Sequence, residues 1–168
     1  MEPVTAFVAW ALQFIDIWGY LGLFIVEIIG SATIIFPAPA FAINFILGGT
    51  PGFNPWLVGI AAGVGSTIGE ITGYGVGRGG REVMKKKYKP WLDKTRKWME
   101  SHGDFLVILL FAATPLPHDV VGLISGAVNY PLKKFMLATL IGKIIAGVVL
   151  AWAGYYSIGF FRDMFGVG

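Results

Sequence analysis

The chain has 168 residues, of which 55% are apolar and only 14% are charged. Because soluble domains carry roughly 25% charged residues, this composition excludes an ordinary soluble protein and predicts one integral membrane domain. The absence of cysteine excludes disulfides, thiolate catalysis and cysteine-ligated metals, and the net charge of +3 is concentrated in one segment.

The first half of the chain predicts a surface helix, a span, a short apolar segment and a second span. Residues 1–16 predict an amphipathic helix at the membrane surface, because their apolar stretch is too short to cross comfortably. Residues 17–36 would cross as a helix of about 30 Å. The apolar stretch 37–49 predicts a re-entrant segment, the turn-forming residues 51–55 follow it, and 56–77 predicts the next span.

A basic segment divides the chain into two halves. Nine of the thirteen lysine and arginine residues lie in 78–97, and the positive-inside rule predicts that this segment is cytoplasmic. We expect residues 78–104 to form an amphipathic linker helix, bent near Pro90, that lies on anionic headgroups. A nucleic-acid patch is the competing interpretation, but a short basic loop between spans is usually a topology signal, so no nucleic acid is expected.

The second half repeats the pattern of the first. The apolar segment 105–127 has basic residues on both flanks, so we expect it to enter and leave on the cytoplasmic face, before the last span 135–158. The interruptions matched at an offset of 78 residues are Pro37 and Pro115, Pro39 and Pro117, and Gly48 and Gly126. A broken helix at membrane depth must be buried in protein or line a cavity. Such a matched pair predicts a transporter-type site between two inverted repeats.

Five ionisable residues lie inside the predicted membrane segments: Glu27, Glu70, His118, Asp119 and Lys143. Each charge costs about 2.5–3.5 kcal/mol at the bilayer centre, so we expect these residues to face the interior, with Lys143 within about 4 Å of an acid. One interpretation is a pair of Glu27 with Lys143 that fastens the bundle and has no transport role. The other is a substrate site in which Glu27, Glu70 and His118 exchange protons.

Glycines of the second span recur every four residues, at Gly65, Gly69, Gly73 and Gly77. This spacing is typical of a face on which another membrane helix packs closely. A histidine–aspartate pair could ligate a metal, but only one other histidine is present, so neither a metal site nor a cofactor is predicted. No nucleophile triad or phosphate-cradling loop is visible, so we do not expect an enzyme.

Three segments resemble the signatures of the DedA family, also called SNARE-associated or VTT-domain proteins. The first signature consists of Glu27, Gly30, Pro37, Pro39 and Gly48. The second is the run 65–78, with Gly69, Glu70, Gly73, Tyr74 and Arg78. The third consists of Phe111 to Pro115, Gly126 and Lys133 to Phe135. The family implies two opposed hairpins and the movement of phospholipid or polyprenyl-phosphate lipids between leaflets, in some members tied to the proton gradient. It also implies that Glu27 and Glu70 are its membrane acids.

Two departures from the family pattern concern the site. Ala40 and Phe41 stand where an acid commonly follows the first Pro-x-Pro element. Ala112 and His118 stand where the second hairpin usually carries two arginines. Headgroup binding by those arginines is therefore not expected here, and His118 would supply only a titratable charge.

We therefore expect an all-α, polytopic protein of the cell membrane with two opposed re-entrant helical hairpins in an inverted repeat. Its parts would be residues 1–16, 17–77, 78–104 and 105–168. The expected function is movement of phospholipid or polyprenyl-phosphate between leaflets, as a scramblase or flippase, with protons as a candidate coupling ion. Two alternatives stay open: proton-coupled exchange of a small cation, and a membrane scaffold that recruits lipid or partners without transport. A homo-oligomer is compatible with the sequence.

Overall fold

The computed structural model describes residues 2–33, 37–114, 116 and 118–165. These residues form helices and no strand, so the predicted all-α fold is confirmed. The helices are α1 (Glu2–Ala32), α2 (Pro37–Gly49), α3 (Pro55–Gly79), α4 (Arg81–His102), α5 (Asp104–Ala113), α6 (His118–Ala127) and α7 (Leu132–Phe165). Within the described ranges, two helical stretches have the length and composition of a membrane span, Thr5–Ala32 and Leu132–Ile158, although the first is bent at Gly19.

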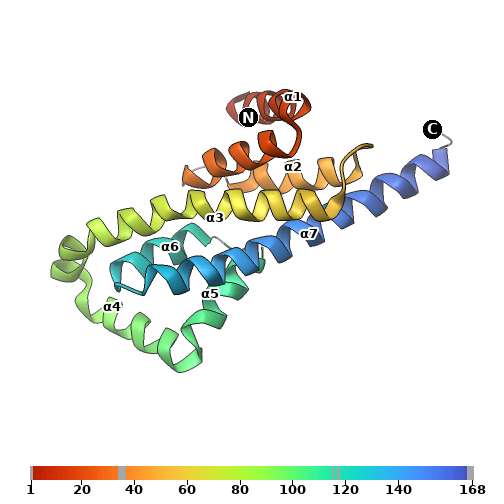
Figure 1. Ribbon diagram of the computed structural model, residues 1–168. Helices are drawn as coiled ribbons and strands as arrows, with labels where there is room; N and C mark the ends of the chain where they lie inside the picture. Colours follow the sequence, from red (N-terminus) through yellow and green to blue (C-terminus); the bar gives the residue numbers. More distant parts are fainter. Residues whose placement is uncertain (1, 34–36, 115, 117, 166–168) are drawn as a thin grey trace.

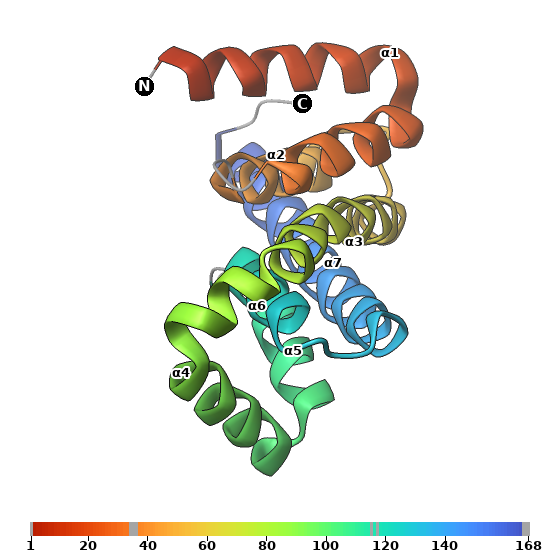
Figure 2. The ribbon, with the colours of Figure 1, turned by 90° about the vertical axis from the view of Figure 1, so that its left-hand side faces the viewer.

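A sharp bend at Gly19 divides α1 into two parts. Its φ of 57° and ψ of −134° are not helical, and this region of backbone conformation is open mainly to glycine. Figure 2 shows the part before the bend lying across the top of the molecule, above the rest of α1. The straight part after the bend, 20–32, is about 20 Å long. It is therefore shorter than the predicted span 17–36, because the bend and the helix end at Ala32 both shorten it.

The long helices α3 and α7 run antiparallel through the centre of the molecule and pack on each other (Figure 1). Glycines in α3 allow this close approach. A Cβ atom at Gly63 would lie 2.7 Å from the Cα of Ile144, and one at Gly59 would lie 2.5 Å from the Cα of Val148. Any larger side chain at these two positions would force the helices apart.

The glycines spaced by four residues along α3 face two other helices. A Cβ atom at Gly65 would lie 2.5 Å from a carbonyl oxygen of α1, and one at Gly69 would lie 2.7 Å from another. A Cβ atom at Gly77 would clash with the backbone of α6, whereas Gly73 has more room, 3.9 Å from the nearest atom of α6. The packing role predicted for this glycine face is confirmed at the first two positions and the last.

The short helices cross over between the two halves of the chain. α1 packs on α3 and α5 packs on α7, whereas α2 packs mainly on α7 and α6 packs mainly on α3 (Figures 1 and 2). The two glycines matched in the sequence lie at these crossings. A Cβ atom at Gly48 would clash with the backbone of Ala151 in α7, and one at Gly126 would clash with the backbone of Tyr74 in α3. Each glycine therefore lets a short helix reach the long helix of the other half.

The first Pro-x-Pro element lies at the start of a helix. α2 begins at Pro37, so the backbone of Pro37 and Pro39 belongs to its first turn, where an amide hydrogen would have no helical partner. The side chains of these two prolines are not among those described. Pro115 and Pro117 lie outside the described residues, in the sequence between α5 and α6.

The basic linker forms the amphipathic helix α4. Its backbone leaves the helical range at Tyr88, with φ −128° and ψ 22°, two residues before Pro90, because proline clashes with the preceding turn. Leu92 and Met99 are buried, whereas Trp91 and Trp98 are about half exposed. The predicted bend and amphipathic character are confirmed, and contact of this helix with headgroups stays a prediction.

Candidate functional site

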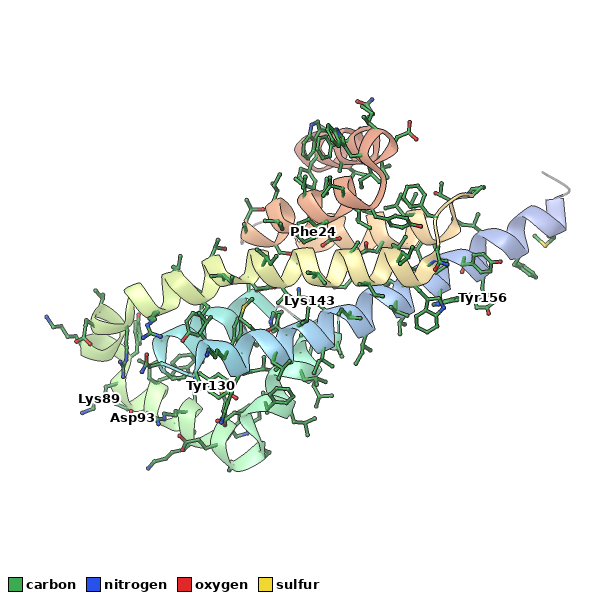
Figure 3. The ribbon with its side chains drawn as sticks, in the orientation of Figure 1. Phe24, Lys89, Asp93, Tyr130, Lys143 and Tyr156 are labelled. Carbon is green, nitrogen blue, oxygen red and sulfur yellow. The ribbon has the colours of Figure 1, made fainter. Side chains whose placement is uncertain are left out.

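A cavity of about 50 Å³ lies where α1, α2, α3, α6 and α7 meet. All five ionisable residues predicted for the site line it, namely Glu27, Glu70, His118, Asp119 and Lys143. Figure 3 shows Lys143 between α3 and α7, near the middle of the molecule. The structure thus brings the predicted residues together, and their role in transport stays a prediction.

Lys143 and Glu70 form an ion pair inside the bundle. The Nζ atom of Lys143 lies 2.9 Å from Oε1 of Glu70, and their side chains are 19% and 2% exposed. The predicted pairing of Lys143 with an acid is therefore confirmed. Because the two residues belong to α7 and α3, the pair links the two central helices. At this burial, loss of one partner would leave an uncompensated charge.

The second carboxylate oxygen of Glu70 has no protein partner in the described part of the chain. This atom, Oε2, is buried and makes no hydrogen bond there. Gly122 of α6 lies next to it, because a Cβ atom at this glycine would lie 3.7 Å from the oxygen, in ordinary van der Waals contact. An unsatisfied buried acceptor costs about 1–3 kcal/mol or more. Glu70 is therefore able to accept a hydrogen bond from a bound group or to take a proton.

Glu27 is held by neutral polar groups. Its Oε1 accepts a hydrogen bond from the Nδ2 of Asn44 at 3.1 Å. Its Oε2 lies 2.6 Å from the Oγ of Ser66. Asn44 belongs to α2 and Ser66 to α3, so Glu27 joins three helices of the first half of the chain. The proposed bundle-fastening pair of Glu27 with Lys143 is wrong, because the close ion pair of Lys143 is with Glu70.

Asn44 and Ser66 also line the cavity, and the sequence analysis missed them. Two signals could have found them. Asn44 is a polar side chain inside the apolar stretch 37–49, and Ser66 lies four residues before Glu70, on the same face of a helix. Both residues are buried, with exposed fractions of 6%. Buried polar groups require partners, which is what Glu27 provides.

His118 and Asp119 enter the cavity from the first turn of α6. The Nε2 of His118 lies 3.2 Å from the Oγ1 of Thr139, and its ring stacks on Phe135, with centroids 5.9 Å apart and an interplanar angle of 11°. The Nδ1 of His118 is buried and has no hydrogen-bond partner among the described residues. Asp119 is partly buried, and its charge near a helix N-terminus is favoured by the helix dipole.

The motif residues Tyr74 and Arg78 lie outside the cavity, toward the basic end of α3. The hydroxyl of Tyr74 donates to the carbonyl of Tyr130, and the Nη1 of Arg78 donates to the Tyr74 hydroxyl at 3.2 Å. The ring of Tyr74 lies 5.3 Å from that of Phe135. These contacts tie α3 to the turn before α7, so the two motif residues support the fold around the cavity.

The size and charge of the cavity limit what it binds. One water molecule needs about 10–15 Å³ measured in this way, so 50 Å³ accommodates a few waters and not an entire lipid headgroup. Three acids and one lysine line it. The arrangement is suited to exchanging hydrogen bonds, protons or small ions, and a larger group would require the helices to move.

The fold and the cavity define an all-helical membrane protein with paired ionisable residues inside its helix bundle. The chain belongs to the VTT-domain family, whose model, described as VTT domain, matches residues 34–156. This match covers α2 to α6 and most of α7. The resemblance to the DedA family stated from the sequence is thereby confirmed.

Several known proteins are similar to this chain in sequence. An uncharacterised protein of Methanocaldococcus jannaschii is 26% identical over 147 residues, which cover 86% of this chain and 89% of that protein. Undecaprenyl phosphate transporter A of Bacillus subtilis is 29% identical over 148 residues, which cover 81% and 70%. Transmembrane protein 41B of Xenopus tropicalis is 35% identical over 105 residues, 59% of this chain, and the match spans only 36% of the frog protein. No solved structure is significantly similar.

Proposed function

We propose that this protein moves a phosphate-bearing lipid, either a phospholipid or a polyprenyl-phosphate, between the two leaflets of the cell membrane. It is a membrane protein of the DedA family, and a relative with 29% identity is named as an undecaprenyl phosphate transporter. The hydrocarbon tails stay in the bilayer while the headgroup passes the central cavity. The role of the site is transport and not catalysis.

The observation that carries this proposal is the buried pair of Lys143 with Glu70, which has one carboxylate oxygen without a partner in the described part of the chain. An arriving phosphate replaces the carboxylate on the Lys143 ammonium. Glu70 then takes up a proton, so the charge of the cavity is preserved while the substrate is bound. This exchange would couple lipid movement to protons.

The cavity must open for a headgroup to pass, because it has room for only a few waters. Thr33, which directly follows α1, and Thr114 and Leu116, which follow α5, all line it. The cavity is therefore bounded by described residues that follow α1 and α5, and a movement of these two parts of the chain away from each other would open it.

The two hairpins are re-entrant and enter from opposite faces as an inverted repeat. The crossing of α2 onto α7 and of α6 onto α3 supports this arrangement, as do the matched glycines at both crossings. The antiparallel central helices agree with a two-fold relation between the halves. In this topology residues 17–77 and 105–168 are the repeats, and the basic segment 78–97 is cytoplasmic.

A second candidate is proton-coupled exchange of a small cation. The observation that favours it is the composition of the cavity, since its three acids outnumber the single lysine and its volume suits an ion better than a headgroup. A scaffold without transport is the remaining alternative.

Purified protein in liposomes distinguishes these functions. We expect it to move fluorescent lipid between leaflets, and we expect Lys143→Met to slow anionic lipids more than zwitterionic ones. Lys134→Met is the matched control, because Lys134 is an exposed lysine at the start of α7. Proton flux that depends on a cation, without lipid movement, would support the exchanger. Equal slowing of both lipid classes, at equal amounts of folded protein, would exclude Lys143 as a headgroup contact.

A further inference from the structure

A second cavity, of about 60 Å³, lies under α4 at the basic end of the molecule. It is separate from the central cavity and shares no lining residue with it. Its lining consists of Arg81, Lys89, Leu92, Asp93, Arg96, Ala127 and Val128. α4 therefore covers one side, and the end of α6 with the residue that follows it forms the floor.

The lining of this cavity has a net positive charge. Three cations line it, Arg81, Lys89 and Arg96, against one acid, Asp93. Figure 3 shows Lys89 and Asp93 together on α4, far from Lys143. Three cations around so small a volume repel one another, so an anion bound between them would relieve that repulsion.

The bend of α4 brings these cations to one cavity. On a straight helix, Arg81 and Lys89 would be about 12 Å apart along the axis. The non-helical backbone at Tyr88 lies between them and redirects the chain so that both line the same space. The bend predicted from Pro90 thus has a consequence for the charge distribution.

Two of the cations have donors available for a ligand. The Nε of Arg81 is buried and has no hydrogen-bond partner among the described residues. Arg96 pairs with Glu100 at 2.8 Å, but the two side chains are 60% and 50% exposed, and such exposed pairs contribute little. A guanidinium presents a planar fork of donors that matches a phosphate group.

We propose that this cavity binds a phosphate group between Arg81, Lys89 and Arg96. Its position at the basic end of the central helices favours the headgroup of an anionic lipid as the source, and free inorganic phosphate carries the same chemistry. The site does not depend on the proposed transport, because none of its residues lines the central cavity.

The test measures binding of short-chain phosphatidic acid to the purified full chain in detergent. Arg81→Gln with Lys89→Gln removes two cations from the cavity, whereas Lys94→Gln with Lys97→Gln removes two exposed cations of α4 outside it. We expect the first double variant to weaken binding roughly tenfold or more and the second to change it by about twofold at most. Equal weakening by both would mean general surface attraction and would overturn the proposal.

Two further measurements keep this test decisive. Lys89→Gln alone changes an exposed side chain, so we expect a loss of several-fold in affinity with little change in stability. Lys89→Gln could bind phosphatidic acid like the wild type, while the Arg81→Gln, Lys89→Gln double variant is only less stable. The cations would then stabilise the fold without binding a ligand, and the proposal would be wrong. Competition by inorganic phosphate would support a site for phosphate from either source. Binding of phosphatidic acid that phosphate does not displace would support the lipid headgroup as the source.

Discussion

The two halves of the chain share a backbone plan but carry different polar groups. In each half a bent or short helix, a second short helix and a long helix follow in order, and the second short helix packs on the long helix of the other half. The offset of 78 residues that matches Gly48 with Gly126 pairs Glu27 with Phe105, Glu70 with Val148 and Lys143 with Gly65. The ionisable residues are therefore not repeated.

This difference shows how the site is divided between the halves. The first half supplies Glu27 and Glu70, with Asn44 and Ser66 as hydrogen-bond donors, and the second half supplies Lys143, His118 and Asp119. The close ion pair of the site nevertheless joins the two halves, because Glu70 belongs to the first and Lys143 to the second. Because these two residues belong to α3 and α7, the Glu70–Lys143 pair requires the two helices to pack together.

The largest effect should come from breaking the pair between the halves. Lys143→Met leaves Glu70 as a buried uncompensated charge, so we expect the free energy of unfolding in detergent to fall by about 3–5 kcal/mol. Adding Glu70→Gln removes that charge and should recover most of the loss. The control Lys134→Met should change stability by at most about 0.5 kcal/mol. A double variant as unstable as the sum of both single changes would show that the pair does not couple the halves.

The next effect tests the equivalence of the two crossings. Gly48→Ala and Gly126→Ala each push a Cβ atom into the backbone of a long helix, so we expect each to lower the free energy of unfolding by about 1–3 kcal/mol. Gly75→Ala is the control, because a Cβ atom there meets nothing within 4 Å. It should be neutral or stabilise by up to about 1 kcal/mol. A loss of stability in only one of these two variants would show that the two crossings are not equivalent.

A smaller effect is expected at the acid that has no close cation. Glu27→Gln keeps a side chain that can bond with Asn44 and Ser66, so its unfolding free energy should fall by no more than about 1.5 kcal/mol. If lipid movement is proton-linked, the folded variant should nevertheless lose transport in liposomes. Residual transport in proportion to the folded protein would make Glu27 a structural fastener.

The smallest effect on stability comes from single cysteines used to map the two faces. The chain has no cysteine of its own, so Thr50→Cys introduces one reporter just after α2 and Lys133→Cys introduces one at the start of α7. We expect the former to react with an impermeant thiol reagent from outside and the latter only from inside. Reaction of both from the same face would rule out the inverted repeat.

Much of the membrane architecture follows from the sequence. The low charge content predicts a membrane domain, and the spacing of Gly65, Gly69 and Gly77 predicts close helix contacts that the structure contains. Pro90 predicts the bend of α4, because the proline ring clashes with the preceding turn of a regular helix. The cost of a charge in hydrocarbon predicts that Glu70 and Lys143 face the interior, since no other location offers them partners.

Only the tertiary structure decided which groups meet. The sequence offered three acids as partners for Lys143. It pairs with Glu70 because α3 and α7 pack closely, and the glycines of α3 allow this close approach. Asn44 reaches Glu27 across 17 positions of sequence, a distance over which no local periodicity carries information. The basic cavity under α4 likewise depends on contacts between distant segments, because α4 and the end of α6 line it together. Local rules give helices and their breaks, whereas the partners of buried polar groups depend on contacts between segments distant in the chain.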